Sequence, residues 1–211
     1  MSIQVHIDNY QVAGFAIITI AWIFSSTSMG LVEWRMWHMD DPSLSSSIVC
    51  VGMWRVCIYK HDSNFSKAKR CHQYAYHDIF LPLDIRTAQH LLLAASALGL
   101  LGKTCAIMAL RNTQRRTQAK ERAHRLFITA GVFAITACCC VSVAVFWNFH
   151  SVMNEERVYF PLSFHLPFQP GNQEIGSAML VAGIGAFLLL LSGLFFLSYT
   201  YPLDIPVNPE N

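Results

Sequence analysis

The 211-residue sequence has little charge, because only 13% of its residues are Asp, Glu, Lys or Arg. An average globular domain carries about 25%. Hydrophobic residues make up 54% of the chain, and its mean hydropathy is +0.36. This shortage of charge leaves too little solvated surface for a soluble enzyme, a disordered tail or a nucleic-acid-binding module. The sequence therefore excludes these three classes.

Four long apolar stretches account for the low share of charged residues. Within them, only His90 and Lys103 are basic or acidic. A helix needs roughly 20 apolar residues to cross a hydrocarbon core, because lipid cannot satisfy exposed backbone groups. No basic residue precedes the first stretch and no clear cleavage site follows it, which favours a retained span over a signal peptide. The sequence predicts one four-span membrane domain over residues 1–211, with spans over residues 12–32, 87–110, 126–149 and 175–201.

Basic residues are distributed unevenly between the two short loops. Six lie in residues 111–125 and one lies in residues 150–174. Short loops rich in positive charge stay cytoplasmic, whereas long loops are translocated largely regardless of charge. We therefore predict a plasma-membrane protein with both termini and loop 111–125 in the cytoplasm, and with loops 33–86 and 150–174 outside the cell. We interpret the basic loop as a topology signal and not as a lipid-binding patch.

The long outward loop has the composition of a small antiparallel sheet. Aromatic and β-branched residues are dense over residues 34–39, 48–59 and 74–80, and turn-forming residues punctuate them at 40–43 and 62–64. Tryptophans at the membrane-facing edge of such a sheet suit the interfacial preference of indole, and we assign Trp37 to this role.

Three of the seven cysteines, Cys50, Cys57 and Cys71, lie in this loop. Oxidising conditions outside the cell favour disulfides in small sheets that lack a sufficient core. A bridge between Cys57 and Cys71 fits the predicted turn between them, and closing a loop of this size contributes about 3 kcal/mol. Cys50 is then either a free thiol or part of an intermolecular bridge. Asn64 begins an Asn-Phe-Ser sequon, which is a candidate glycosylation site in an outward loop.

The loop also carries a recognisable motif. Trp34, the Gly-Met-Trp of residues 52–54, Cys57 and Cys71 resemble the Trp, Gly-Leu-Trp, Cys, Cys signature of the claudins. Gly52 and Trp54 are identical to that signature. Residues 81–85 (Leu-Pro-Leu-Asp-Ile) and 102–105 (Gly-Lys-Thr-Cys) also resemble claudin segments around the second span. Myelin-type four-span proteins and calcium-channel gamma subunits share the main pattern.

This resemblance implies a four-helix transmembrane bundle with a small extracellular antiparallel sheet, located at the tight junction between cells. It implies cell–cell adhesion with paracellular sealing or charge-selective permeability, through contacts with itself or other claudins in one membrane and across the intercellular gap. The alternative is a channel-associated regulatory subunit of the same superfamily. In claudins the stretch near the second cysteine lines the paracellular pore; here it holds Lys67, Lys69, Arg70 and His72.

Fixed positive charge along a narrow path repels cations, so a conducting strand of this protein would disfavour them. A solvated turn without conduction is the other interpretation of these residues. Two departures from the family stand out. Gln89 occupies the position of the Arg that claudins usually carry before the second span. The chain given ends Asn-Pro-Glu-Asn, so binding of a PDZ scaffold through this tail is not expected.

We find no catalytic or metal-binding pattern, and the sequence predicts neither an enzyme nor a cofactor. The histidines of the outward loop lack metal-ligand spacing, and residues 138–140 (Cys-Cys-Cys) lack the Cys-x-x-Cys of a thiol oxidoreductase. Lys103 is expected to extend toward the cytoplasmic face, and Cys105 near that face is a candidate palmitoylation site. The Phe-rich loop 150–174 either contacts a facing molecule or packs on the sheet.

Overall fold

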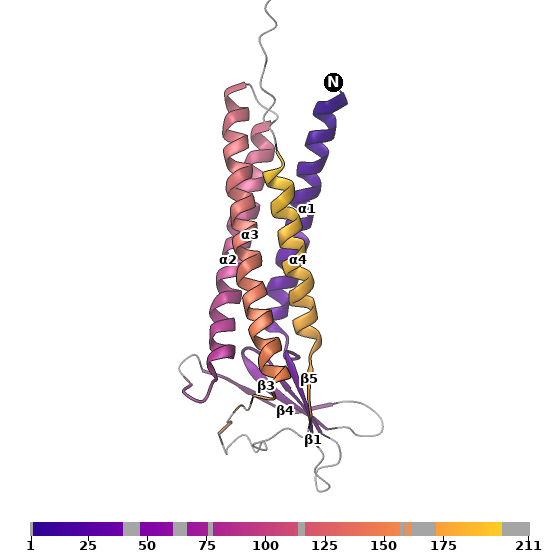
Figure 1. Ribbon diagram of the computed structural model, residues 1–211, viewed down its shortest axis with the longest axis vertical. Helices are drawn as coiled ribbons and strands as arrows, with labels where there is room; N and C mark the ends of the chain where they lie inside the picture. The colour runs from indigo at the N-terminus through magenta and orange to yellow at the C-terminus, as the bar shows by residue number, and fades with distance from the viewer. Residues whose placement is uncertain are drawn as a thin grey trace, which may run out of the picture.

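The computed structural model describes residues 2–39, 47–60, 67–75, 78–113, 117–156, 158, 160–161 and 172–199. Four helices lie alongside one another and a sheet covers one end of them, opposite the N-terminus (Figure 1). This arrangement confirms the predicted four-helix bundle with a small antiparallel sheet. The elements in chain order are α1 (Ser2–Gly30), β1 (Arg35–Met39), β2 (Ser47–Val51), β3 (Arg55–Lys60), β4 (Lys67–Gln73), α2 (Leu83–Thr113), α3 (Thr117–Met153), β5 (Asn172–Ile175) and α4 (Ser177–Leu197).

All four helices are long and apolar enough to cross a membrane. Three of them are longer than the spans expected from composition, because α1 begins at Ser2, α2 ends at Thr113 and α3 begins at Thr117. Most of the segment predicted as loop 111–125 is therefore helical. The hydrocarbon thickness limits only the apolar part of a helix, and polar turns can continue it into water. At this end of α3, Arg125 donates to Glu121 one turn earlier, with an N–O distance of 2.7 Å.

Small side chains fill the contacts between the helices. In lipid no hydrophobic force drives helices together, so close approach of small residues supplies the packing energy. The buried alanines of the bundle are Ala21, Ala88, Ala95, Ala106, Ala109, Ala123, Ala130, Ala134, Ala137, Ala144, Ala178, Ala182 and Ala186. A few larger apolar side chains, such as Phe127 and Phe196, are also buried between the helices, whereas others, such as Leu180 and Phe187, are exposed on the outside of the bundle, where lipid would surround them.

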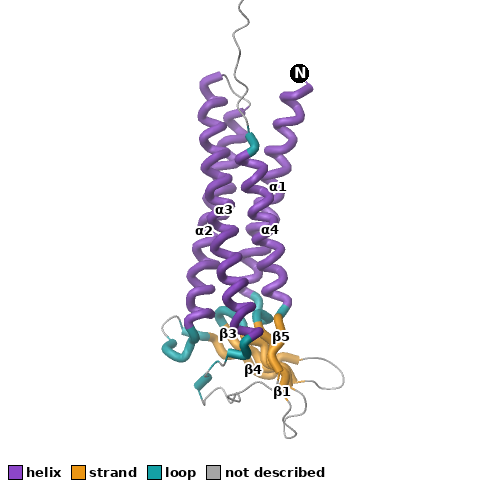
Figure 2. Tube along the Cα trace, in the orientation of Figure 1, coloured by secondary structure: helices purple, strands orange, loops and turns teal. Residues whose placement is uncertain are grey.

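The sheet is antiparallel with strand order β4-β3-β2-β1-β5. The strands β1 to β4 follow one another in the chain, and all five lie together below the helices (Figure 2). The fifth strand comes from the segment between α3 and α4 and pairs with β1 from Arg35↔Ile175 to His38↔Asn172. The sequence predicted residues 172–174 as part of a loop and Ile175 as the start of the fourth span. A four-residue strand is too short to show alternation, and its partner lies far away in the chain.

Two strand predictions need correction. Residues 48–59 form two strands separated by a turn at residues 52–54, and the described residues of the third segment (74, 75 and 78–80) are not in a strand. The strand β4 ends at Gln73, after which the Asp78 carboxylate accepts a hydrogen bond from the Ala75 N–H at 2.6 Å. This local side-chain bond offers the backbone an alternative to the sheet ladder. The turns predicted at residues 40–43 and 62–64 lie outside the described residues.

Trp37 belongs to the core of the sheet and is not an interfacial anchor, since it is completely buried. Its ring meets that of Phe160 edge-on, with centroids 5.6 Å apart. Phe160 also contacts the rings of Tyr74 and Phe80, each at 6.2 Å. Phe160, from the segment predicted as loop 150–174, therefore packs onto the segment predicted as loop 33–86. The other phenylalanines of segment 150–174, Phe164 and Phe168, lie outside the described residues.

The side chain of Lys103 does not extend toward the end of α2, contrary to the prediction. Its Nζ lies 3.5 Å from the centroid of the Trp22 ring on α1. A side chain on α2 points back toward the start of its helix, so the ammonium meets this ring in a cation–π contact. The Trp22 N–H in turn donates to the Ser96 carbonyl on α2 at 2.9 Å. The lysine thus links two helices.

Candidate functional site at the sheet end of the bundle

The Gly-Met-Trp of residues 52–54 forms the tight turn between β2 and β3. The Gly52 N–H donates to the Arg55 carbonyl at 2.9 Å. A Cβ at Gly52 would lie 2.7 Å from the Val32 Cα, so the close approach of this backbone requires glycine. The side chain of Gln89 donates to the Met53 carbonyl at 2.6 Å. Gln89 is buried, and it holds the turn against α2 from the position where claudins usually carry Arg.

Trp34 is also buried and lies between the end of α1 and the start of β1. Its indole N–H donates to the Ser28 carbonyl at the end of α1 at 2.8 Å. Its own carbonyl accepts the Gly176 N–H at 3.1 Å, just before α4 begins. The Ser177 hydroxyl donates to the Glu33 carboxylate across the same junction. The signature tryptophan therefore fixes the sheet to both α1 and α4.

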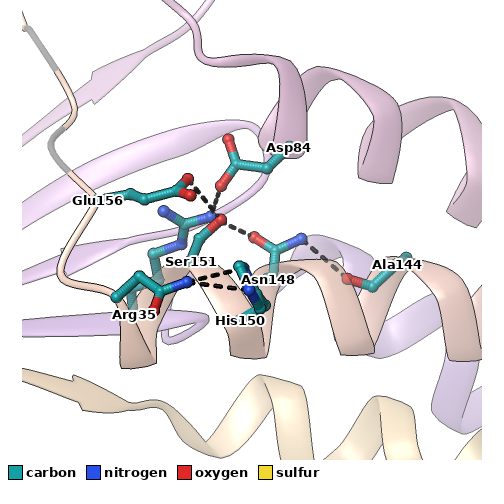
Figure 3. A network of polar contacts seen from close by, with 8 residues as sticks. Arg35, Asp84, Ala144, Asn148, His150, Ser151 and Glu156 are labelled. Carbon is teal, nitrogen blue, oxygen red and sulfur yellow. Dashed lines mark hydrogen bonds and ion pairs between the residues drawn. The ribbon is translucent and has the colours of Figure 1, made fainter.

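A buried ion pair fixes the sheet to the other two helices. Arg35 of β1 donates to the Asp84 carboxylate at the start of α2 and to the Asn148 side-chain carbonyl on α3, the latter at 2.7 Å (Figure 3). Arg35 is 1% exposed and Asp84 is 3% exposed. The Asn148 amide donates to the Ala144 carbonyl at 3.0 Å, which orients its oxygen toward the guanidinium. Three segments distant in sequence thus meet at one charged contact.

Next to this contact α3 ends in a turn. Glu155 adopts a backbone φ of 52°, which lies in the left-handed region that favours glycine. The following residue, Glu156, accepts a hydrogen bond from the Ser151 hydroxyl at 2.9 Å, and its backbone N–H donates to the Ser151 carbonyl at 2.9 Å (Figure 3). These bonds reverse the chain toward the sheet directly after the last helical turn.

Cys57 and Cys71 form the predicted disulfide. They are direct cross-strand partners on β3 and β4, and β4 is an edge strand. Cys50 is a free thiol and is 4% exposed. Burial raises the pKa of the Cys50 thiol to about 11, and the neighbouring Glu33 carboxylate contributes in the same direction. Burial likewise raises the pKa of the Tyr74 hydroxyl in the aromatic core.

The candidate pore residues are all on β4. Arg70 is exposed and lies opposite Ile58, while His72 is half-buried and lies opposite Val56. The register shifts next to this point, between Ile58 and Tyr59. Lys67 and Lys69 belong to the same strand, but their side chains are outside what the structure describes, as is the sequon residue Asn64.

The remaining candidates lie elsewhere in the fold. Cys105 is half-buried on α2, and its palmitoylation stays a prediction. Among the described residues no group of three or more His, Cys, Asp or Glu is arranged to hold a metal ion. The histidine His38 instead lies 3.1 Å from the Glu174 carboxylate across the β1–β5 pair.

Sequence reasoning missed Arg35 and Asn148. Asp84 was singled out only as part of a motif, with no role given. One signal was available for Asn148, because a polar amide near the end of an apolar span needs a partner. For Arg35 the local sequence offers no signal, since it is one of seven basic residues between positions 33 and 86.

A model of the family described as PMP-22/EMP/MP20/claudin tight junction matches residues 15–198. The chain belongs to this family. Rat claudin-7 (Rattus norvegicus) is 24% identical over 189 residues, which cover 88% of this chain and 83% of the relative. Dog claudin-2 (Canis lupus familiaris) is 25% identical over 199 residues, covering 92% and 79%. Bovine claudin-4 (Bos taurus) is 24% identical over 186 residues, covering 87% and 82%. The protein is thus a multi-pass membrane protein and a divergent member of the claudin family.

Proposed function

We propose that this claudin-family protein acts at tight junctions, where it mediates cell–cell adhesion and seals the paracellular space. The observation that carries the proposal is the rigid attachment of the bridged sheet to all four helices. Trp34 and Gly176 link it to α1 and α4, and Arg35 links it to α2 and α3 through Asp84 and Asn148. A sheet held in this way can transmit force between a membrane and a facing molecule.

The proposed orientation has the sheet outside the cell and both termini in the cytoplasm. The N-terminus, the last turn of α2 and the first turn of α3 lie at the end of the bundle opposite the sheet (Figure 1). The basic residues of segment 111–125 favour the cytoplasm by the positive-inside rule. The disulfide of the sheet requires an oxidising compartment, which supports the same orientation.

Two exposed apolar features near the sheet support lateral association of neighbouring copies. Ile79, in the turn before α2, is 96% exposed. On α3, Phe146 is 75% exposed and contributes to a groove of about 480 Å³, which is also lined by Ser142, Val143, Trp147 and His150. A protruding apolar side chain and an apolar groove at the same end of the molecule can pair between two copies in one membrane.

The positive charge on β4 suggests that the paracellular path discriminates between cations and anions. The side chain of Arg70 is exposed on an edge strand, with Lys67 and Lys69 on the same strand. If neighbouring sheets enclose a path for ions, this edge contributes positive charge and disfavours cations. Dilution potentials across expressing monolayers test this part. Reversing the three basic residues to Glu should move the permeability ratio toward cations, and an unchanged ratio would remove them from the pathway.

Freeze-fracture imaging tests the main proposal in cells that lack endogenous junctions. Expression of the full chain should produce continuous intramembrane strands at cell contacts. A matched variant, Ile79→Ser, should reach the cell surface but form fewer or shorter strands. Absence of strands, together with failure to concentrate at contacts and co-purification with an ion-channel subunit, would instead favour the role of a channel-associated subunit.

A further inference from the structure

The sheet contains three cysteines in one row, and only two of them are bonded. Cys50 of β2 lies directly opposite Cys57 of β3, and Cys57 lies directly opposite Cys71 of β4. In antiparallel strands, residues that face each other directly carry their side chains on the same face of the sheet. The free thiol of Cys50 therefore adjoins the disulfide, on the side of Cys57 away from Cys71.

We propose that Cys50 is an internal exchange thiol that moves the disulfide from Cys57–Cys71 to Cys50–Cys57 and so turns Cys71 into an exposed modification site. Substitution at sulfur proceeds through attack of a thiolate on one sulfur of the disulfide while the other leaves. Such attack runs along the axis of the bond that breaks. The row provides this order, with the nucleophile, the attacked sulfur and the leaving sulfur on three successive strands.

The step is balanced without an external oxidant or reductant. Cys50 loses its proton, and its sulfur forms a bond to the Cys57 sulfur. The bond between Cys57 and Cys71 breaks, and Cys71 leaves as a thiolate that takes up a proton. One disulfide and one thiol are present before and after the exchange.

The two possible bridges differ in what they expose. Cys50 and Cys57 are both buried, at 4% and 2% exposure, whereas Cys71 is exposed. The exchange therefore trades a buried thiol for an exposed one, which a low-molecular-weight disulfide or an alkylating reagent can reach. It also moves the covalent link away from β4, so that this edge strand is no longer covalently bonded to β3.

The resting protein is expected to keep the Cys57–Cys71 bridge. Burial and the Glu33 carboxylate both keep the Cys50 thiol protonated, and a protonated thiol is a poor nucleophile. The exchange is therefore slow while the Cys50 thiol is protonated and proceeds when this thiol loses its proton.

Trypsin separates the three cysteines, which allows a direct test. Cleavage after lysine and arginine gives peptide 36–55 with Cys50, peptide 56–60 with Cys57 and peptide 71–86 with Cys71. The purified full-length protein in detergent is incubated with excess N-ethylmaleimide and no reductant, then denatured in the same reagent, digested and analysed by mass spectrometry. At the first time point, peptide 56–60 should be linked to peptide 71–86.

With time, a new species should accumulate in which peptide 36–55 is linked to peptide 56–60 and Cys71 carries the maleimide. In Cys50→Ser the maleimide on Cys71 should fall by at least about tenfold, because the internal nucleophile is gone. Cys105→Ser removes a thiol outside the sheet and should behave as wild type. An intact 56–60/71–86 link in Cys50→Ser shows that the sheet has formed, and Cys50→Ala provides a second background.

Two results would overturn the proposal. One is equal labelling of Cys71 in wild type and Cys50→Ser, which would mean that the bridge opens without Cys50. The other is alkylation of Cys50 while the original bridge persists. The test uses solubilised protein, so its outcome is independent of the orientation and junctional role proposed above.

Discussion

The two halves of the molecule are stabilised in different ways. The helical bundle is packed mainly through buried alanines together with a few large side chains such as Phe127 and Phe196, and many of its other large apolar side chains are exposed on the outside. The sheet depends on a few specific links: one disulfide, one buried ion pair and the hydrogen bonds of the Gly-Met-Trp turn. Packing of small residues is distributed over many positions, whereas the links of the sheet are few and each joins particular residues.

This difference indicates where substitutions should be tolerated. Lipid-facing positions of the bundle need only be apolar, while the sheet needs particular residues in particular partnerships. It can be tested with two spectroscopic signals. Three of the five tryptophans, Trp34, Trp37 and Trp54, belong to the sheet, so fluorescence reports mainly on the sheet, and far-ultraviolet circular dichroism reports mainly on the helices.

The largest effect is expected from Arg35→Ala. Removing the guanidinium leaves the Asp84 carboxylate buried without its partner, and breaking a buried pair in this way costs about 3–5 kcal/mol. Unfolding of the solubilised protein, followed by tryptophan fluorescence, measures the loss. Arg125→Ala is the control, because it breaks an exposed pair worth at most about 1 kcal/mol. Equal losses in the two variants would contradict the role given to Arg35.

Removing the disulfide should affect the sheet more than the bundle. The double variant Cys57→Ser, Cys71→Ser loses the constraint on the unfolded loop, at a cost of about 3 kcal/mol. The fluorescence transition should move to lower temperature while the helical signal of circular dichroism changes little. A parallel shift of both signals would show that the two halves unfold as one unit.

Overpacking a helix contact should instead destabilise the bundle more than the sheet. Ala134 is completely buried on α3, so Ala134→Leu inserts a side chain for which the packed helices have no room. The expected cost is about 1–3 kcal/mol. Val132→Leu makes a similar change at a half-exposed position of the same helix and should be nearly neutral. Unfolding of both variants, followed by circular dichroism, measures these changes in stability. A large loss of stability in Val132→Leu would contradict the tolerance expected at lipid-facing positions.

The sheet should also lose stability at alkaline pH. The pKa of Cys50 is raised by burial from 9.0 to about 11 in the folded state. The stability that comes from its protonated thiol is complete below pH 9 and is lost as the pH rises to about 11, on the order of 2 kcal/mol. Glu33 and Tyr59 are the titratable groups coupled to it.

Cys50→Ser isolates this contribution, because Tyr59 and Tyr74 titrate in both proteins. The fluorescence midpoint of wild type should fall relative to that of the variant between pH 9 and 11. Identical pH profiles would show that the Cys50 thiol makes no contribution.

The smallest effect is expected at the end of α3. Glu155 has a φ of 52°, so Glu155→Gly relieves an unfavourable backbone conformation and should gain up to about 1 kcal/mol. Glu155→Ala removes the same carboxylate without relieving the backbone. Thermal unfolding of the two variants separates the effects, and equal stability would mean that the conformation costs little.

The sequence predicted those features that depend on local composition or on a compact motif. Four apolar stretches were enough to identify the helices, and the turn-forming residues between Cys57 and Cys71 predicted their bridge, while the motif around Trp34 and residues 52–54 indicated the family. The motif gave no reason for Gly52, which is needed because the Val32 backbone passes close to it. Trp37 was assigned to the membrane interface, because an indole in an interfacial sheet and one in its core look alike until the packing of Phe160 is known.

By itself the sequence determined that the chain spans a membrane four times and carries a small bridged sheet. The length of an apolar stretch and the composition of a strand are properties of residues that are neighbours in the chain. Only the tertiary structure decided that Arg35 meets Asp84 and Asn148, that β5 joins β1, and that Cys50 lies next to the disulfide. These contacts join segments far apart in the chain. Their free energy depends on burial and on distance in space, which no local pattern encodes.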